Sequence, residues 1–273
     1  MYSAVILTLN EEKALPECLA SLAGCDDIVV LDSGSTDATV SIAKAAGARV
    51  FSRPFDNFAG QHNHAQSDIA FRHPWVFHLD ADERMTPELS AECELASARA
   101  DLDGFRVAPK MIFEGRWIPH CTDYPAFQAR FVRAPAFRFA QVGHGQREAP
   151  GMRLENLREG YLHDISIYGR DAWVAKHRTY AAAEAAAQVG KGGGIPWRDL
   201  LSADPLVRRR ALKQASFSLP FRPTLRFLYQ YILRRGFIDG RQGLDYCLLL
   251  SRYEGFIAAE IDKLNRAAPG ATH

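Results

Sequence analysis

Short apolar runs alternate with amphipathic segments over the first hundred residues of the chain. Four runs rich in apolar residues predict buried β-strands; they are residues 3–9, 27–31, 48–51 and 75–79. The segments between and after them predict helices; these are residues 11–23, 37–46, 60–70 and a helix that starts near residue 87. Strands and helices in this order predict an α/β fold with a mostly parallel sheet and helices on both faces.

Polar residues mark the ends of the predicted helices. We expect Asn10 and Asp37 to cap the first two helices, because their side chains can accept a hydrogen bond from the first turn. Gly47 follows the second helix, where glycine can adopt the left-handed conformation that ends a helix. Thr86 precedes Pro87, which suits the first helical position because that position needs no N–H donor. Asp37 is therefore interpreted as mainly structural.

The alternation fades beyond about residue 101. Residues 105–107, 128–132 and 137–139 resemble strands, and the chain is helical in pattern from residue 171 onward. The run of lysine and three glycines at residues 191–194 predicts a flexible break. The pattern thus predicts a sheet domain over residues 1–170 and a helical C-terminal region over residues 171–273.

Composition limits the classes of protein that fit. The chain has 273 residues, 47% of them hydrophobic, and a formal net charge of +1, so no global field attracts nucleic acid. Its five cysteines are odd in number and lack CxxC spacing, which argues against a disulfide framework or a zinc ribbon. The N-terminus resembles no signal peptide, and no uncharged apolar run could span a bilayer. We expect a cytoplasmic protein.

Polar side chains follow three of the predicted strands. Thr8 and Asn10 end the first strand, Asp32 ends the second, and Asp80 and Asp82 end the fourth. Ligands of open α/β sheets bind beyond the carboxyl ends of the strands. We therefore expect these side chains to converge on one crevice.

The pair of aspartates in VFHLDADER predicts a site for a hard divalent cation. Carboxylate oxygens suit Mg²⁺ or Mn²⁺, and magnesium commonly completes its shell with substrate phosphates and water. The alternative is a solvated turn in which Asp80 caps the next helix. Asp32 can accept hydrogen bonds from a ribose or a base; the alternative is that DSGSTD serves only as a helix cap.

Four motifs then indicate a family. The segments VILTLNEE, DDIVVLDSGSTDAT, GQHNHA and VFHLDADERMTPEL resemble, in order and spacing, the family 2 glycosyltransferases. The branch that they resemble most is the lipopolysaccharide core glycosyltransferases that add glucose. The resemblance implies a GT-A fold, a UDP-sugar donor, a glycan or glycolipid acceptor, Mg²⁺ or Mn²⁺, and inversion at the sugar carbon. Residues 1–170 would then be the catalytic domain.

The resemblance also implies roles for individual residues. The residues implied to bind the nucleotide sugar are Thr8, Asn10, Glu11, Asp32, Asn63, Asp80 and Lys176. Those implied to hold the metal are Asp80 and Asp82, with His163 as a further ligand; the alternative for His163 is a structural hydrogen bond. Lys176, with Tyr180, matches a family pattern and could neutralise phosphate charge; the alternative is an ordinary surface lysine.

The acceptor side departs from the family pattern. Ala126 follows Tyr124-Pro125 where the family has aspartate, although Arg130 is in place, and Arg147 replaces a histidine before Glu148. The acceptor therefore stays open. Glu148 and Asp123 are the candidates for the general base, and a solvent-exposed loop acid is the alternative for each.

Residues 205–241 form a basic segment. The segment contains nine basic residues and a single acid, Asp239. The basic residues are Arg208, Arg209, Arg210, Lys213, Arg222, Arg226, Arg234, Arg235 and Arg241. Within this segment Leu225, Leu228, Tyr229 and Ile232 follow helical spacing. The segment either lies on the anionic inner face of a membrane or packs on the catalytic domain. No known nucleic-acid-binding motif accompanies it.

Two other functions are alternatives to glycosyl transfer. A nucleotidyltransferase or phosphohydrolase could use the same carboxylates, but LTLNEEK lacks the glycines that usually follow the first strand of such nucleotidyltransferases. A non-catalytic membrane-docking relative would explain the changed Ala126 and Arg147, but the intact Asp80–Asp82 pair argues against it.

Overall fold

A computed structural model describes residues 1–142, 145–189, 197–203, 207–208, 211 and 221–267. The chain forms two compact units: Met1–Trp117 with Asp123–Ile167, and Ile118–Thr122 with Tyr168–His273. The glycine-rich break expected at residues 191–194 lies outside the described residues, as do Arg209, Arg210 and Lys213 of the basic segment.

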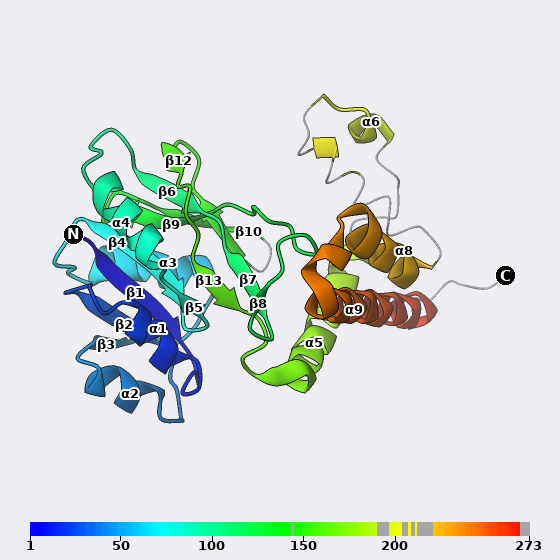
Figure 1. The fold of residues 1–273 in the computed structure, drawn as a ribbon, viewed down its shortest axis with the longest axis horizontal. Coiled ribbons are helices and arrows are strands. Elements are labelled where there is room, and N and C mark those ends of the chain that lie inside the picture. The colour runs from blue at the N-terminus through cyan, green and yellow to red at the C-terminus, as the bar shows by residue number, and fades with distance from the viewer. Residues whose placement is uncertain (143–144, 190–196, 204–206, 209–210, 212–220, 268–273) are drawn as a thin grey trace. The chain divides into compact units, whose positions relative to one another are not determined.

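A seven-stranded sheet forms the centre of the first unit (Figure 1). Its strands in spatial order are β12 (Leu154–Asn156), β6 (Gly104–Val107), β9 (Gln128–Arg133), β4 (Trp75–Asp80), β1 (Ser3–Thr8), β2 (Ile28–Asp32) and β3 (Arg49–Ser52). The last four are mutually parallel, as their continuous apolar runs predict. β9 is antiparallel to both of its neighbours.

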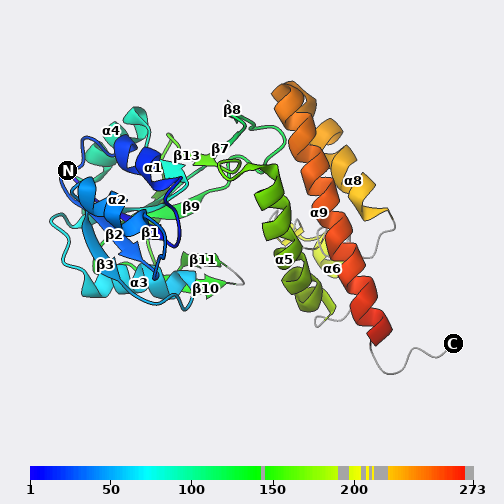
Figure 2. The same ribbon diagram turned by 90° about the horizontal axis from the view of Figure 1, so that it is seen from below.

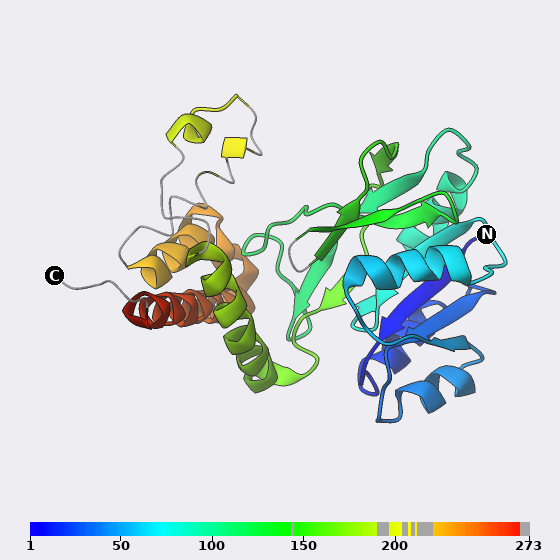
Figure 3. The ribbon, with the colours of Figure 1, turned by 180° about the vertical axis from the view of Figure 1, so that it is seen from behind.

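Helices cover both faces of this sheet. They are α1 (Leu15–Ser21), α2 (Thr39–Ala45), α3 (Phe58–Asp68) and α4 (Pro87–Ala96). On one face Ile6 packs in a cluster with Leu15 of α1 and Leu89 of α4. On the other face Val5 packs with Ala65 of α3, which crosses the sheet in Figure 3. Alternate residues of one buried strand thus serve two cores.

Two smaller sheets flank the central one. One contains β5 (Glu83–Arg84), β13 (Leu162–Asp164), β7 (Lys110–Phe113) and β8 (Arg116–Trp117), in that order. The other pairs β10 (Phe139–Val142) with β11 (Gly145–Glu148). The strand expected at residues 137–139 therefore begins two residues later than its sequence suggests.

The expected cap at Asn10 is wrong, and α1 begins later than predicted. Asn10 has a φ of +58°, and its side-chain oxygen accepts a hydrogen bond from the backbone N–H of Thr36. The helix starts at Leu15 without a side-chain cap. By contrast, Thr86 accepts a hydrogen bond from the N–H of Leu89 and caps α4 as expected.

The second unit is helical. It contains α5 (Gly169–Val189), α6 (Trp197–Leu200), α8 (Arg222–Leu228), the π-helical turn η1 (Tyr229–Leu233), the 3₁₀ turn η2 (Gly236–Asp239) and α9 (Gly240–Ala267). Both α5 and α8 pack along α9 (Figure 2). The described helices include none that is long and apolar enough to cross a bilayer.

Candidate active site

The carboxyl ends of β1, β2 and β4 meet at one edge of the central sheet. Thr8 of β1 lies opposite Asp32 of β2, and Leu7 lies opposite Asp80 of β4. Asp32 and Asp80 therefore end the two strands that flank β1. This edge is where a doubly wound sheet binds its ligands.

Asp32 is buried and organises the loop that follows β2. Its Oδ1 accepts hydrogen bonds from the hydroxyls of Thr8, at 2.9 Å, and Ser35, at 2.5 Å. Its Oδ2 accepts from the N–H groups of Gly34, at 2.9 Å, and Ser35, at 2.8 Å. Burial opposes ionisation, but these bonds lower the pKa of Asp32. The carboxylate expected to bind uridine is thus bound by the protein's own donors.

The loops after β1 and β2 are joined by hydrogen bonds. The N–H of Asn10 donates to Ser35 and that of Glu11 donates to Thr39, both at 2.8 Å. Asp37 accepts from the N–H groups of Glu12 and Thr39, which agrees with its expected structural role, but the expected cap at Asp37 is wrong because Ala38 is the N-cap residue of α2. Together with Asp32, these bonds hold the two loops as one preformed frame at the edge of the sheet.

Asp80 shares a buried arginine with a second carboxylate. Nη2 of Arg130, on β9, lies 2.9 Å from Oδ2 of Asp80 and 2.7 Å from Oε1 of Glu83. The N–H of Asp80 also donates to Oε2 of Glu83 at 2.9 Å. Glu83 is fully buried, whereas the side chain of Asp80 keeps 34% of its surface exposed. Asp80 can therefore still meet a ligand.

Burial and charge act differently on these two acids. Burial opposes ionisation of Asp80, but Arg130 outweighs it and lowers the pKa of that carboxyl. Burial raises the pKa of Glu83 to about 8, against the opposing field of Arg130. Asp80 is consequently the acid that stays ionised near neutral pH. Sequence reasoning missed Glu83; the only signal was a further acid directly after DAD.

Asp82 is paired with His163. Pairing of β13 with β5 sets His163 opposite Glu83 and places its Nε2 3.4 Å from Oδ2 of Asp82. Burial opposes the positive charge, but Asp82 and Glu83 raise the pKa of His163 to about 8. The contact with Asp82 agrees with the structural alternative for His163, and its role as a further metal ligand stays a prediction.

The donor set fits a cation that takes few ligands from protein. No group of three or more His, Cys, Asp or Glu side chains is arranged to hold a metal among the described residues. Asp80 and Asp82 nevertheless present carboxylates that are 34% and 27% exposed. Two carboxylates with substrate phosphates and water suit Mg²⁺ or Mn²⁺ better than a closed protein cage would.

The side chain of Asn63 is bonded to the backbone of Phe139, and its expected role in donor binding stays a prediction. Its Nδ2 donates to the carbonyl of Phe139 at 2.8 Å, and its Oδ1 accepts from the N–H of Phe139 at 2.9 Å. The Asn63 amide therefore links α3 to β10, because it makes the same pair of backbone hydrogen bonds that a residue of a neighbouring strand would make. Sequence alone could not show this, because β10 lies far away along the chain.

The two candidate bases differ in their surroundings. Oε1 of Glu148 accepts bonds from Nε and Nη2 of Arg106, at 2.8 and 2.5 Å. Burial opposes its ionisation, but hydrogen bonds from its own backbone and from Arg106 lower the pKa of Glu148. Asp123 is exposed. The side chain of Glu148, by comparison, is 27% exposed.

Lys176 belongs to α5 in the helical unit. Its Nζ lies 5.9 Å from the centre of the Tyr180 ring, a cation–π contact within the helix. A role for Lys176 at the phosphates stays a prediction.

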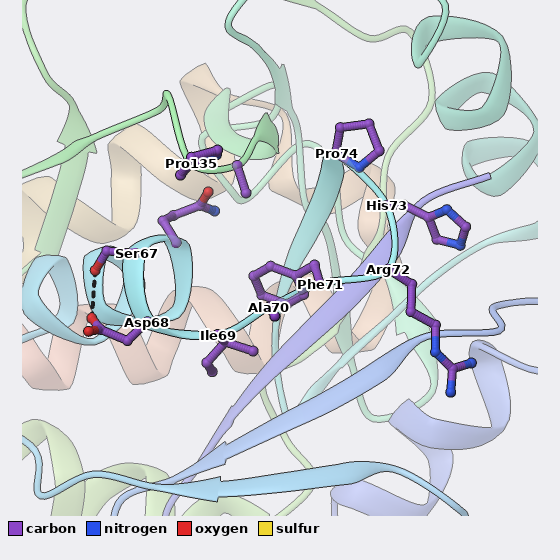
Figure 4. Close-up of a pocket in the computed structure, with 11 residues that line it drawn as sticks. Ser67, Asp68, Ile69, Ala70, Phe71, Arg72, His73, Pro74 and Pro135 are labelled. Atoms are coloured by element: carbon purple, nitrogen blue, oxygen red, sulfur yellow. Dashed lines mark hydrogen bonds between the residues drawn. The ribbon is translucent and has the colours of Figure 1, made fainter.

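A pocket of about 420 Å³ lies elsewhere in the first unit (Figure 4). It is lined by the end of α3, by the turn before β4 and by Ala134 and Pro135. Asp68 in this lining accepts a hydrogen bond from Ser67. Because β4 starts beside this pocket and ends at Asp80, the pocket lies at the opposite end of that strand from the carboxylates.

Comparisons with known proteins identify the family of this chain. The model of the glycosyl transferase family 2 matches residues 3–122. The lipopolysaccharide core biosynthesis glycosyltransferase LpsC of Rhizobium meliloti is 31% identical over 212 residues, which cover 75% of this chain and 77% of LpsC. The chain belongs to glycosyltransferase family 2. The family predicted from the four motifs is thereby confirmed, and the enzyme is a glycosyltransferase.

Two further relatives show the extent of the likeness. An uncharacterised glycosyltransferase of Rickettsia typhi is 36% identical over 104 residues, but these cover 38% of this chain and 35% of that protein. The mannosyltransferase PcManGT of Pyrobaculum calidifontis, solved with GDP-Man and Mn²⁺, has a TM-score of 0.51 and 14% identity, covering 95% of this chain and 86% of that one. This likeness shows the fold alone, and the expected GT-A fold is confirmed.

Proposed function

We propose that this glycosyltransferase moves a hexose, glucose, from a UDP-sugar to a glycan acceptor of the lipopolysaccharide-core type, with inversion. The observation that carries the proposal is the pair of partly exposed carboxylates, Asp80 and Asp82, at the edge framed by the loops after β1 and β2. The likeness to LpsC supports the acceptor class.

On the donor side, Asp80 and Asp82 would hold Mg²⁺ or Mn²⁺. A bound cation stabilises the charge that develops on the diphosphate as it leaves. Arg130 keeps Asp80 ionised and fixes one of its oxygens, which leaves the rest of the carboxylate for the ligand. The loop frame around Asp32 is already ordered, so little entropy remains to be lost when the nucleotide binds.

On the acceptor side, a carboxylate removes the proton of the attacking hydroxyl. The hydroxyl oxygen forms a bond to the anomeric carbon while the bond from that carbon to the UDP oxygen breaks, so the sugar is inverted and UDP leaves. Asp123 is the favoured base because it is exposed, and Glu148 is second because its side chain is only 27% exposed. Such a base contributes about 10²–10⁴-fold to the rate.

The identity of the donor can be tested by nucleotide binding and release. Isothermal titration with UDP and with GDP, each with and without Mn²⁺, should show binding of UDP that strengthens with the metal. A panel of UDP-sugars should then release UDP fastest from UDP-glucose in the presence of a core-type acceptor. Tighter binding of GDP, or equal binding without metal, would refute the donor and metal assignments.

The base can be tested with a matched pair of variants. Asp123→Asn should lower kcat by about 10²–10⁴-fold with little effect on the dissociation constant of UDP. Glu148→Gln should lower kcat less, and should weaken the fold because Arg106 loses its ion pair. If Glu148→Gln proves the more damaging for kcat at unchanged stability, the two assignments must be exchanged.

A further inference from the structure

The helix α8 and the turn η1 present an apolar face to solvent. We define the α8–η1 face by six residues that follow helical spacing: Phe221, Leu225, Leu228, Tyr229, Ile232 and Leu233. The exposed fractions are 79% for Phe221, 74% for Leu233, 53% for Ile232 and 41% for each of the other three. Contiguous exposed apolar surface of this kind usually marks an interaction site.

The buried side of the same helix is polar. Arg222 is buried and forms an ion pair of 2.6 Å with Glu254 of α9. Gln230 is buried and donates to the carbonyl of Cys121 at 2.8 Å, and Arg234 donates to that of Thr122 at 2.8 Å. The helix is thus fixed to its own unit by polar side chains while its apolar stripe points outward. A helix that merely packs on a core would bury the stripe instead.

The charges around this face are positive. Arg235 is exposed in the same segment, and Arg241, whose side chain is 88% exposed, lies 3.7 Å from Asp245 of α9. The only acid in residues 221–241, Asp239, is buried and accepts hydrogen bonds from the N–H groups of His120 and Cys121. An exposed apolar stripe bordered by arginine is the composition of a helix that lies in a lipid interface.

We propose that the α8–η1 face docks on the surface of a bilayer that contains anionic lipids. Its leucine, isoleucine and aromatic side chains enter the boundary between headgroups and acyl chains, while the arginines bind lipid phosphates. A second copy of this chain is disfavoured as the occupant, because a two-fold contact would bring two basic borders together. The proposal is independent of the sugar and the acceptor.

Flotation of the 273-residue protein tests this directly. The protein should float with vesicles of phosphatidylcholine and phosphatidylglycerol, should not float with phosphatidylcholine alone, and should be released as salt is raised. The double variant Ile232→Ser/Leu233→Ser should lower partition to the anionic vesicles by roughly tenfold or more. Both residues are exposed, so the variant should keep the circular dichroism and thermal midpoint of the wild type.

A matched control comes from the first unit. Leu95 of α4 is 78% exposed, and Leu95→Ser should leave partition unchanged. Absence of flotation with anionic vesicles would overturn the proposal, as would equal loss of flotation in the control. The proposal would also be overturned if the wild type bound no vesicles but self-associated in light scattering, and the double variant did not. That result would assign the α8–η1 face to a second copy of the chain.

Discussion

Nη2 of Arg130 lies 2.9 Å from Oδ2 of Asp80, although the two residues are 50 positions apart in the chain. The contact exists because β9 runs antiparallel beside β4 and turns Arg130 toward the carboxyl end of that strand. Arg130 is also the cation nearest to the buried Glu83. One guanidinium therefore sets both the charge and the orientation of the carboxylate proposed to meet the metal.

Replacement of Arg130 should damage stability and activity together. Arg130→Met leaves Glu83 and Asp80 without their cation and should lower the free energy of unfolding by about 3–5 kcal/mol. Urea denaturation measures this loss. The double variant Arg130→Met/Asp80→Asn should recover part of the stability, because the acid that Arg130 keeps ionised is then neutral, but not the activity. A loss below about 1 kcal/mol in Arg130→Met would contradict the network described here.

Neutralisation of the carboxylate pair should abolish metal-dependent transfer. Asp82→Asn and Asp80→Asn should each lower kcat by about 10²–10⁴-fold, because the cation would lose a charged ligand. UDP release at saturating Mn²⁺ measures the effect. Asp101→Asn is the control, since Asp101 forms an exposed pair with Arg99 in the same unit. A variant of the pair with near-normal turnover would remove the metal assignment.

Asp32 should prove important for the order of its loop. In Asp32→Ala both acceptor oxygens are removed, so all four donors around them lose their partner. We expect a loss of about 2–3 kcal/mol in the free energy of unfolding. Hydrogen exchange at the N–H groups of Gly34 and Ser35 should become faster in the variant. Unchanged exchange at both would mean that the carboxylate does not hold the loop.

Acid should destabilise the first unit through two buried histidines. The Nδ1 atoms of His62 on α3 and His78 on β4 share a hydrogen bond of 2.7 Å. Burial lowers the pKa of His62 from 6.5 to about 4 and holds that of His78 well below its usual range. Between pH 6.5 and 4 the unfolded chain binds protons that the folded chain excludes. Stability should therefore fall as pH falls through this window, by roughly 3 kcal/mol for His62.

The slope of the free energy of unfolding against pH shows which histidine causes the loss of stability. Urea unfolding at several values between pH 7 and pH 4 should show a shallower decline for His62→Gln than for the wild type. His64 lies on the same helix and pairs with Asp68 near the surface, so His64→Gln should keep the wild-type slope. Equal slopes in all three proteins would show that other groups control the acid response.

Sequence reasoning was most successful where structure depends on neighbours in the chain. The apolar runs gave the four parallel strands, and Thr86 with Pro87 gave the start of α4. The prediction failed where a segment far away in the chain determines the hydrogen-bond partners of a residue. Asn10 was expected to cap a helix, but the loop after β2 offers its side chain a better donor in the N–H of Thr36.

The candidate site shows the same division. The convergence of Asp32 and Asp80 follows from parallel strands, and so could be predicted. The pairing of His163 with Asp82 depends on β13 meeting β5, and the use of Asn63 depends on β10; neither contact has a local signal. The helical spacing of the apolar residues in α8 could be recognised in the sequence, but such a pattern does not tell which side of the helix packs against its own unit.

The five residues Ile118–Thr122 belong to the helical unit although the chain on either side of them belongs to the sheet unit. Asp239, Gln230 and Arg234 bind their backbone. The polypeptide thus passes between the units three times, after residues 117, 122 and 167. Cleavage at a single position therefore cannot separate the two units with all their residues. A fragment that ends at residue 167 would keep residues 118–122 without the helices that bind them. A fusion of the helices alone to another enzyme would lack this peptide.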